Sequence, residues 1–303
     1  MKKLELDMKY FRGAVSPGMR MNKNLQAYYY KNELWKIRAN CASSIQIAFV
    51  TDATELSIDM QFAESAREVF TCDVQVNNEL TTFDGSGSHQ LSMPEGGKNV
   101  IIHMPHLAVL SQFEVALNDS AAVSELPPPS RRLLLCGDSI MQGMTCTSPG
   151  RALGPLLAAD LNYQLHNTSV GGAIMHPDQV KASLEIPCDV ILVGLGINDS
   201  GAKTDLELFR SRTRSVLTML NNFSGKAFIV TPLPCAVEAE KLRSVYSQII
   251  REEQQKFPAV QLIEGCDILP LDTSLLCDNL HPNDRGMQVY AKNMAGVLRQ
   301  AGC

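Results

Sequence analysis

The sequence predicts an α/β protein in which an antiparallel β-sandwich precedes a three-layer domain with a parallel sheet. Two observations lead to this fold class. In the first part of the chain, apolar and polar residues alternate with period two, as in strands with one buried face. In the second part, short apolar runs alternate with segments of helical pattern, which is typical of parallel strands and the helices that connect them.

The period-two pattern extends from Ser44 to about Asn118. Turn-rich segments at 84–87 and 94–97 interrupt it, and short strands at this spacing predict an antiparallel, jelly-roll-like sandwich over residues 1–125. The apolar positions that define the pattern are Ile45, Ile47, Phe49, Leu56, Ile58, Met60, Phe62, Phe113, Val115 and Leu117.

Three consecutive prolines, Pro127–Pro129, mark the change of pattern. Proline supplies no backbone donor and favours a stiff extended chain, so we expect a linker over 126–132 and a second domain over 133–303. Its expected strands lie at 133–136, 164–166, 189–193, 227–230 and 260–263, and its expected helices at 204–222, 236–257 and 284–300.

Composition narrows the class of function. The 303 residues are 45% hydrophobic and 19% charged, and 27 basic against 32 acidic residues give a net charge of −5. No run of lysine or arginine stands out, which argues against nucleic acid or an anionic membrane as partner. No stretch approaches the ~20 apolar residues of a membrane span. We therefore expect a small-molecule partner, and the oligomeric state stays open.

The cysteines and the first residues predict a cytoplasmic protein. The nine cysteines are scattered, odd in number and without a Cys-x-x-Cys pair, which favours reduced thiols. The polar residues in Leu4–Lys9 interrupt any apolar core of a signal peptide after Met1-Lys2-Lys3.

Polar, glycine-containing segments follow three of the expected parallel strands. They are Gly137-Asp138-Ser139-Ile140, the run from Asn167 to Gly172, and Gly196-Ile197-Asn198-Asp199. Because ligand sites of parallel sheets lie at the carboxyl ends of strands, these segments should meet in one crevice. Ser139 offers a hydroxyl there.

A second segment near the C-terminus supplies what a nucleophilic serine needs. Asp278 stands three residues before His281, and in a turn this spacing places both side chains on one side. The carboxylate then orients the ring through Nδ1, while Nε2 faces the serine. Alone, the same spacing also suits a helix N-cap.

Donors for a developing oxyanion are also present. Gly172 offers an unobstructed backbone N–H, Asn198 an amide, and Ser139 its own N–H. Alternatively, Gly172 supplies only a positive φ and Asn198 only shapes a turn. The four segments occur together, which favours the catalytic interpretation.

Four segments of the sequence resemble, in their order, the four blocks of the SGNH/GDSL hydrolases. They are Gly-Asp-Ser-Ile, a glycine five residues after an asparagine, Gly-x-Asn-Asp and Asp-x-x-His-Pro. The match covers about 133–303 and assigns Ser139, Gly172, Asn198 and His281 to the name-giving positions, with Asp278 completing the triad. The resemblance implies a flavodoxin-like fold and ester hydrolysis, with no metal or organic cofactor. A preceding β-sandwich is similar to that of family-two carbohydrate acetylesterases and of a GDSL-type acyltransferase of polyketide tailoring.

The expected activity is that of a serine esterase acting on short acyl groups of a carbohydrate or similar polyol, on family analogy. Two alternatives stay open: an acyltransferase with the same residues, and a non-catalytic carbohydrate-binding protein. Outside the four blocks, His103 and His106 have metal-like spacing but lack nearby ligands. The aromatics Tyr28-Tyr29-Tyr30 and Trp35 suit either a core or a sugar platform, and His176 either a pocket mouth or an exposed loop.

Overall fold

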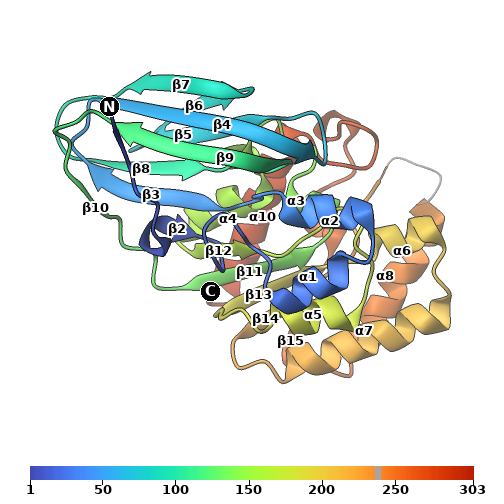
Figure 1. Cartoon of the computed structure of the whole chain (residues 1–303). Helices are drawn as coiled ribbons and strands as arrows, with labels where there is room; N and C mark the ends of the chain where they lie inside the picture. The colour runs from blue at the N-terminus through green and yellow to red at the C-terminus, as the bar shows by residue number, and fades with distance from the viewer. Residues whose placement is uncertain (236–239) are drawn as a thin grey trace.

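The computed structural model describes residues 1–235 and 240–303 and contains two antiparallel sheets and one parallel sheet. The antiparallel sheets are built from the first part of the chain, and the parallel sheet from the second (Figure 1). The predicted fold class is confirmed.

The two antiparallel sheets share one hydrophobic core. Leu56 and Ile58 of one sheet and Ile47 and Val74 of the other are fully buried in the same cluster, so the alternation read from the sequence is that of strands with one face inside. The first sheet has the order β1-β9-β4-β7, with β1 (Lys2–Lys3), β4 (Glu55–Ser65), β7 (Gly87–Ser92) and β9 (Ala108–Leu117). The second has the order β10-β3-β8-β5-β6 with β2 beside β3, from β2 (Phe11–Arg12), β3 (Gln46–Thr51), β5 (Thr71–Val76), β6 (Glu79–Asp84), β8 (Lys98–His103) and β10 (Val123–Glu125).

The parallel sheet has the strand order β12-β11-β13-β14-β15, which is the flavodoxin-like order. All of its pairings are parallel. The strands are β11 (Arg132–Gly137), β12 (Gln164–Asn167), β13 (Val190–Gly194), β14 (Lys226–Val230) and β15 (Val260–Ile263). The order reverses beside β11, so a crevice forms where β11 and β13 end.

Helices cover both faces of the parallel sheet and form separate cores with it. Leu133 and Leu135 of β11 point into one core, and Leu134 into the other. The helices are α3 (Ser139–Gln142), α4 (Leu153–Leu161), α5 (Pro177–Ser183), α6 (Ile197–Ala202), α7 (Leu206–Asn221), α8 (Glu240–Gln254), α9 (Gly265–Ile268) and α10 (Asp284–Gln300), with 3₁₀ turns at Met8–Tyr10, Pro149–Arg151 and Thr273–Leu275. The predicted helix at 236–257 begins with residues 236–239, which lie outside the described residues. No helix in the described ranges is long and apolar enough to cross a membrane.

Two helices in the first part of the chain were not expected from its strand pattern. They are α1 (Lys23–Tyr29) and α2 (Glu33–Asn40), capped by the side chains of Asn22 and Asn32. Leu25 and Tyr29 are buried in the same core as Leu134 and Val193 of the parallel sheet. Residues of the N-terminal part therefore complete one face of the parallel-sheet part.

The segment between β10 and β11 carries the three prolines, and Arg12 donates hydrogen bonds to the carbonyl oxygens of Leu126 and Pro127 at 2.9 and 3.1 Å. The division of the chain into domains at 126–132 stays a prediction.

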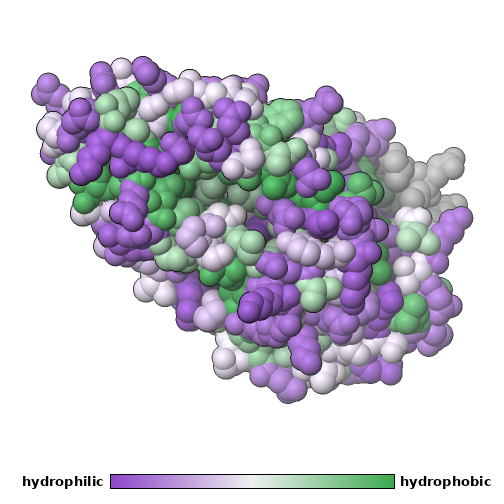
Figure 2. All heavy atoms as spheres, viewed as in Figure 1, coloured by the Kyte–Doolittle hydropathy of each residue, from purple (hydrophilic) through white to green (hydrophobic). Residues whose placement is uncertain are grey.

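Figure 2 shows hydrophobic side chains gathered in the hollow between the antiparallel sheets and the helices, while the helical surface in view is mainly hydrophilic. Apolar side chains, among them Leu6, Phe11, Leu110 and Phe113, also line a groove.

Candidate active site

Ser139 begins α3 directly after β11, at the carboxyl edge of the parallel sheet. The Asp138 side chain caps this short helix by accepting a hydrogen bond from the Ile140 N–H at 2.9 Å. Gly143 ends the helix with a left-handed φ of 82°, a conformation that glycine adopts at little cost. The serine is therefore held on a tight strand-to-helix turn, and it keeps 8% of its surface exposed.

Ser139, His281 and Asp278 form a continuous hydrogen-bonded chain. Ser139 Oγ lies 2.9 Å from His281 Nε2. His281 Nδ1 lies 2.8 and 3.0 Å from the two carboxylate oxygens of Asp278. The structure thus brings together, across 142 residues of sequence, a hydroxyl, an imidazole and a carboxylate in the arrangement that activates a serine nucleophile.

The segment that carries His281 is a tight turn before α10. Asp278 Oδ1 accepts hydrogen bonds from the backbone N–H groups of Leu280 and His281 at 3.2 and 2.8 Å. Partial burial raises the pKa of Asp278, but the hydrogen bonds from the His281 backbone and ring outweigh burial, so its pKa lies below the ordinary value. The carboxylate is therefore ionised at neutral pH and suited to hold a proton on Nδ1.

Gly172 lies on the loop after β12 and has a positive φ of 82°. A Cβ at this position would lie 2.9 Å from Arg38 Nη1 and 3.1 Å from the indole nitrogen of Trp35. Gly172 therefore has two reasons to be glycine: its backbone conformation and the close approach of two side chains from α2.

Asn198 lies in the first turn of α6, after β13, and its amide Nδ2 donates a hydrogen bond to the carbonyl oxygen of Ala173 at 2.9 Å. The next residue, Asp199, accepts a hydrogen bond from the Met175 N–H at 2.7 Å. The structure thus joins the Asn198 segment to the loop that carries Gly172, as expected for segments at neighbouring strand ends.

Four residues that the motifs do not include hold the Gly172 loop. Gln142 accepts a hydrogen bond from the Gly171 N–H at 2.7 Å, and Arg38 Nη1 donates to the Gly171 carbonyl oxygen at 2.8 Å. The fully buried Arg20 donates to the carbonyl oxygens of Asn167 and Ser169 at 2.8 and 2.9 Å, and Trp35 covers Gly172. Helix α2 carries Trp35 and Arg38. The sequence signal for α1 and α2 is the pair of capping asparagines, Asn22 and Asn32, each followed by a run of residues that suits a helix.

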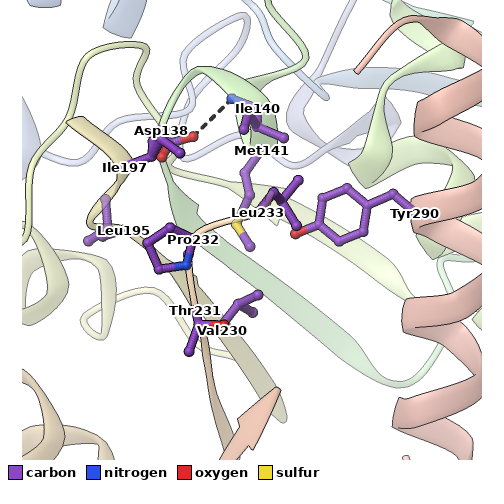
Figure 3. A pocket seen from close by; sticks show the side chains of 11 residues that line it. Asp138, Ile140, Met141, Leu195, Ile197, Val230, Thr231, Pro232, Leu233 and Tyr290 are labelled. Atoms are coloured by element: carbon purple, nitrogen blue, oxygen red, sulfur yellow. Dashed lines mark hydrogen bonds between the residues drawn. The ribbon is translucent and has the colours of Figure 1, made fainter. Parts of the chain in front are cut away.

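Behind the serine turn lies a small cavity of about 20 Å³, lined among others by Asp138, Thr231 and Tyr290 (Figure 3). Such a volume accommodates a single water molecule. Burial raises the pKa of Asp138 to about 7. The residue before the nucleophile is thus a carboxyl group whose protonation changes near neutral pH.

The other candidates from the sequence are not members of the triad. His103 and His106 are buried in the sandwich part, where the His103 ring contacts Gln46 at 3.3 Å. Within residues 1–235 and 240–303, no group of three or more His, Cys, Asp or Glu side chains could hold a metal ion. Tyr28 stacks on Trp35 with ring centroids 6.0 Å apart and contacts the His176 ring at 5.2 Å.

Comparisons with known proteins agree with this geometry. The GDSL-like Lipase/Acylhydrolase family model matches residues 135–289, just over half of the chain. Curated protein sequences give no significant match.

Several solved structures share the fold at low sequence identity. A GDSL-like lipase from Bacteroides ovatus is 15% identical, with a TM-score of 0.82 over 96% of this chain and 94% of that one. The salicylyl-acyltransferase SsfX3 from a tetracycline biosynthetic pathway is 19% identical, with a TM-score of 0.80 over 96% and 94%. A family two carbohydrate esterase from Cellvibrio japonicus is 18% identical, with a TM-score of 0.63 over 85% and 89%.

The lipase and the acyltransferase match across both the antiparallel and the parallel parts of the chain, since each alignment covers nearly all of it. At these identities the likeness establishes the fold, while the family match rests on the segment with the four motifs. The chain belongs to the GDSL-like lipase/acylhydrolase family of esterases.

Proposed function

We propose that this protein hydrolyses short-chain acyl esters of a carbohydrate or similar polyol through an acyl-Ser139 intermediate. The observation that carries the proposal is the unbroken contact from Ser139 Oγ through the His281 ring to Asp278, with distances of 2.9 and 2.8 Å. A lone serine at a strand end does not require such a chain, whereas a serine nucleophile does.

In the first half of the reaction, Ser139 Oγ attacks the ester carbonyl carbon while His281 Nε2 takes the hydroxyl proton. Asp278 stabilises the resulting imidazolium, which then gives the proton to the leaving alcohol. In the second half, His281 Nε2 takes a proton from water while the water oxygen attacks the acyl carbonyl carbon. The bond to Ser139 Oγ then breaks, the acid leaves, and the imidazolium returns the proton to Ser139 Oγ.

The backbone N–H groups of Ser139 and Gly172 and the Asn198 amide would stabilise the oxyanion. In the part of the chain that the structure describes, neither backbone N–H has a hydrogen-bond acceptor. Asn198 Nδ2 already donates to the Ala173 carbonyl oxygen, and its second amide hydrogen can serve the oxyanion. These three donors come from the segments that follow β11, β12 and β13.

The carbohydrate half of the proposal has two supports. Family two carbohydrate esterases are among the structures of similar fold. In addition, the partly exposed Trp35 lies over Gly172, where an aromatic face suits the apolar side of a sugar ring.

The proposed location is the cytoplasm. The scattered cysteines support it, because they suit reduced thiols.

A series of p-nitrophenyl esters from acetate to octanoate tests the proposal. We expect kcat/KM to be highest for acetate or another short chain, and we expect turnover to vanish in Ser139→Ala. A wild-type protein that folds normally but turns over none of these esters, nor acetylated sugars, would contradict an esterase function.

An acyltransferase is the second candidate, because SsfX3 shares the fold over almost the whole chain. The two activities differ only in whether water or an alcohol attacks the acyl-serine. Adding polyols at increasing concentration to a fixed acyl donor separates them. A hydrolase gives mainly free acid, and an acyltransferase gives mainly the new ester.

A further inference from the structure

Gly171 and Gly172 are the two central residues of a tight turn. The Ala173 N–H donates to the Val170 carbonyl oxygen at 2.9 Å and closes the turn. Gly172 has a φ of 82°, whereas the φ of Gly171 lies outside the left-handed region. A left-handed third residue alone is the pattern of a type II turn. The turn begins beside the proposed nucleophile, because the Val170 N–H donates to the carbonyl oxygen of Gly137 at 3.0 Å.

A turn of this kind has two orientations of its central peptide unit, the one that joins Gly171 to Gly172. Between a type II and a type I turn this unit differs by about half a rotation, so its carbonyl oxygen and its N–H exchange sides. Glycine at both central positions is compatible with either orientation. The sequence of the turn therefore does not select one of them, and contacts from outside the turn must do so.

Arg38 of α2 contacts that peptide unit directly. Its Nη1 donates to the Gly171 carbonyl oxygen at 2.8 Å, and the charge on the donor makes this one of the stronger kinds of hydrogen bond. The carbonyl oxygen and the N–H of a trans peptide unit point in opposite directions. Because the carbonyl oxygen is held toward Arg38, the Gly172 N–H points away from it.

The other N–H groups of the turn have acceptors within the chain. Those of Val170 and Ala173 donate to carbonyl oxygens, and the Gly171 N–H donates to the buried Gln142 side chain at 2.7 Å. In the ranges 1–235 and 240–303, the Gly172 N–H has no such acceptor, and Gly172 is partly exposed. Within these ranges, the turn thus leaves one donor for a bound ligand.

We propose that Arg38 is a positioning residue of the reaction: it fixes the Gly171–Gly172 peptide unit in the orientation that presents the Gly172 N–H to the oxyanion. This assignment rests on the proposed esterase function. Rotation of the unit would instead present the Gly171 carbonyl oxygen, whose partial negative charge repels an oxyanion. Arg38 does not touch the reacting atoms, and it acts only through this peptide unit.

The main chain of Arg38 stays anchored when its side chain is replaced. Gln142 Nε2 and Arg20 Nη2 donate to the Arg38 carbonyl oxygen at 2.8 and 2.7 Å. Arg38→Met therefore removes the contact with Gly171 and keeps these two bonds, while Arg38→Lys keeps a charged donor. The matched control is Lys36→Met, which removes a cation from the same helix that pairs with a carboxylate of that helix.

Kinetics with p-nitrophenyl acetate measure the effect. Arg38→Met should lower kcat by roughly tenfold or more with little change in KM, because an oxyanion donor binds the transition state more strongly than the ester. Arg38→Lys should recover part of this loss, and Lys36→Met should match the wild type. A role of Arg38 in folding alone would lower the melting temperature and leave the kcat of the folded protein unchanged.

Crystal structures of the wild type and of Arg38→Met give a second result that does not depend on activity. We expect the Gly171 carbonyl oxygen to face α2 in the wild type and to turn toward Ser139 in Arg38→Met, in all molecules or as a second conformer. An unturned carbonyl in Arg38→Met, or an unchanged kcat, would overturn the positioning role while the esterase function stands. If the wild type hydrolyses no ester, the esterase function fails, and the two structures still decide whether Arg38 sets the peptide orientation.

Discussion

The triad turn and the Gly172 loop meet at the same edge of the parallel sheet, and the Gly172 loop also receives hydrogen bonds from the first part of the chain. The triad side is held from within the second part: Thr145, just after α3, donates to the Pro282 carbonyl oxygen at 2.8 Å. The Gly172 loop is held by Gln142 of the second part and, in addition, by Arg20 and Arg38, more than 130 residues upstream. The proposed triad thus lies within the second part, while the loop of the proposed oxyanion donor Gly172 is held by both parts.

The largest expected effect concerns the triad itself. Ser139→Ala should lower kcat/KM by a factor on the order of 10³ or more, because the nucleophile is lost, while the melting temperature stays near that of the wild type. His281→Ala should cost a similar factor, and the double variant little more than either, because the two residues act as a unit. Substantial turnover in a well-folded, contaminant-free Ser139→Ala protein would remove Ser139 from its role.

Asn198→Ala tests the oxyanion side. An amide donor that binds more strongly to the oxyanion than to the ester carbonyl acts in the transition state, so kcat should fall by roughly 10²–10³ with little change in KM. Asn198→Asp should be at least as harmful, because it places a negative charge beside the developing anion.

The contact of Asn198 with the Ala173 carbonyl oxygen offers a purely structural alternative. Under that alternative, both Asn198 variants would lower the melting temperature more than they lower kcat. Kinetics and thermal melts on the same preparations decide between the two roles.

Arg20→Met tests whether the first part of the chain positions the second. Arg20 is fully buried and donates four hydrogen bonds, to the carbonyl oxygens of Arg38, Cys41, Asn167 and Ser169. Removing it leaves buried carbonyls without donors, so the free energy of unfolding should fall by about 3 kcal/mol. Denaturant unfolding measures this change, and kcat should fall as well.

The matched control for Arg20 is Arg12→Met. Arg12 also donates to two carbonyl oxygens, but these lie in the proline segment and the contacts are partly exposed. We expect a loss below about 1 kcal/mol and an unchanged kcat. Equal effects of the two substitutions on kcat would mean that Arg20 has no special relation to the Gly172 loop.

The smallest expected effect concerns Asp138 on the triad side. Burial raises its pKa from 3.8 to about 7, so between these values the folded protein holds a proton that the unfolded chain has lost. The free energy of unfolding should therefore fall as pH rises through this window. Asp138→Asn has no charge to bury and keeps an oxygen for the Ile140 N–H, so its fall between pH 5 and pH 8 should be smaller by about 1 kcal/mol or more.

Thermal melts across this range check the Asp138 prediction, with the exposed Asp84→Asn as control. The same pH dependence in the wild type and Asp138→Asn would show that ionisation of Asp138 does not limit stability.

Much of the fold was predictable because its signals are local. The strand at Val260–Ile263 and the helix at Asp284–Gln300 have the expected bounds, since buried parallel strands and amphipathic helices leave strong patterns. The contact between Ser139 and His281 was also expected, because motifs at strand ends converge at one edge.

Other parts of the site left no such pattern. Helix α2 has a single buried residue, Ala39, so it lacks the apolar periodicity by which helices are recognised. Arg20 and Arg38 bind backbone carbonyl oxygens of a distant loop, and any loop sequence offers those. Only the folded chain reveals that Arg20 and Arg38 contact the loop of the candidate active site.

The central claim is that His281 and Asp278 make Ser139 the nucleophile, and covalent labelling tests it most directly. A fluorophosphonate reacts with an activated serine, and peptide mass mapping locates the adduct. We expect one adduct per chain on Ser139, and none in Ser139→Ala or in wild-type protein denatured before labelling. An adduct on another serine, or no labelling of the folded protein, would contradict the account.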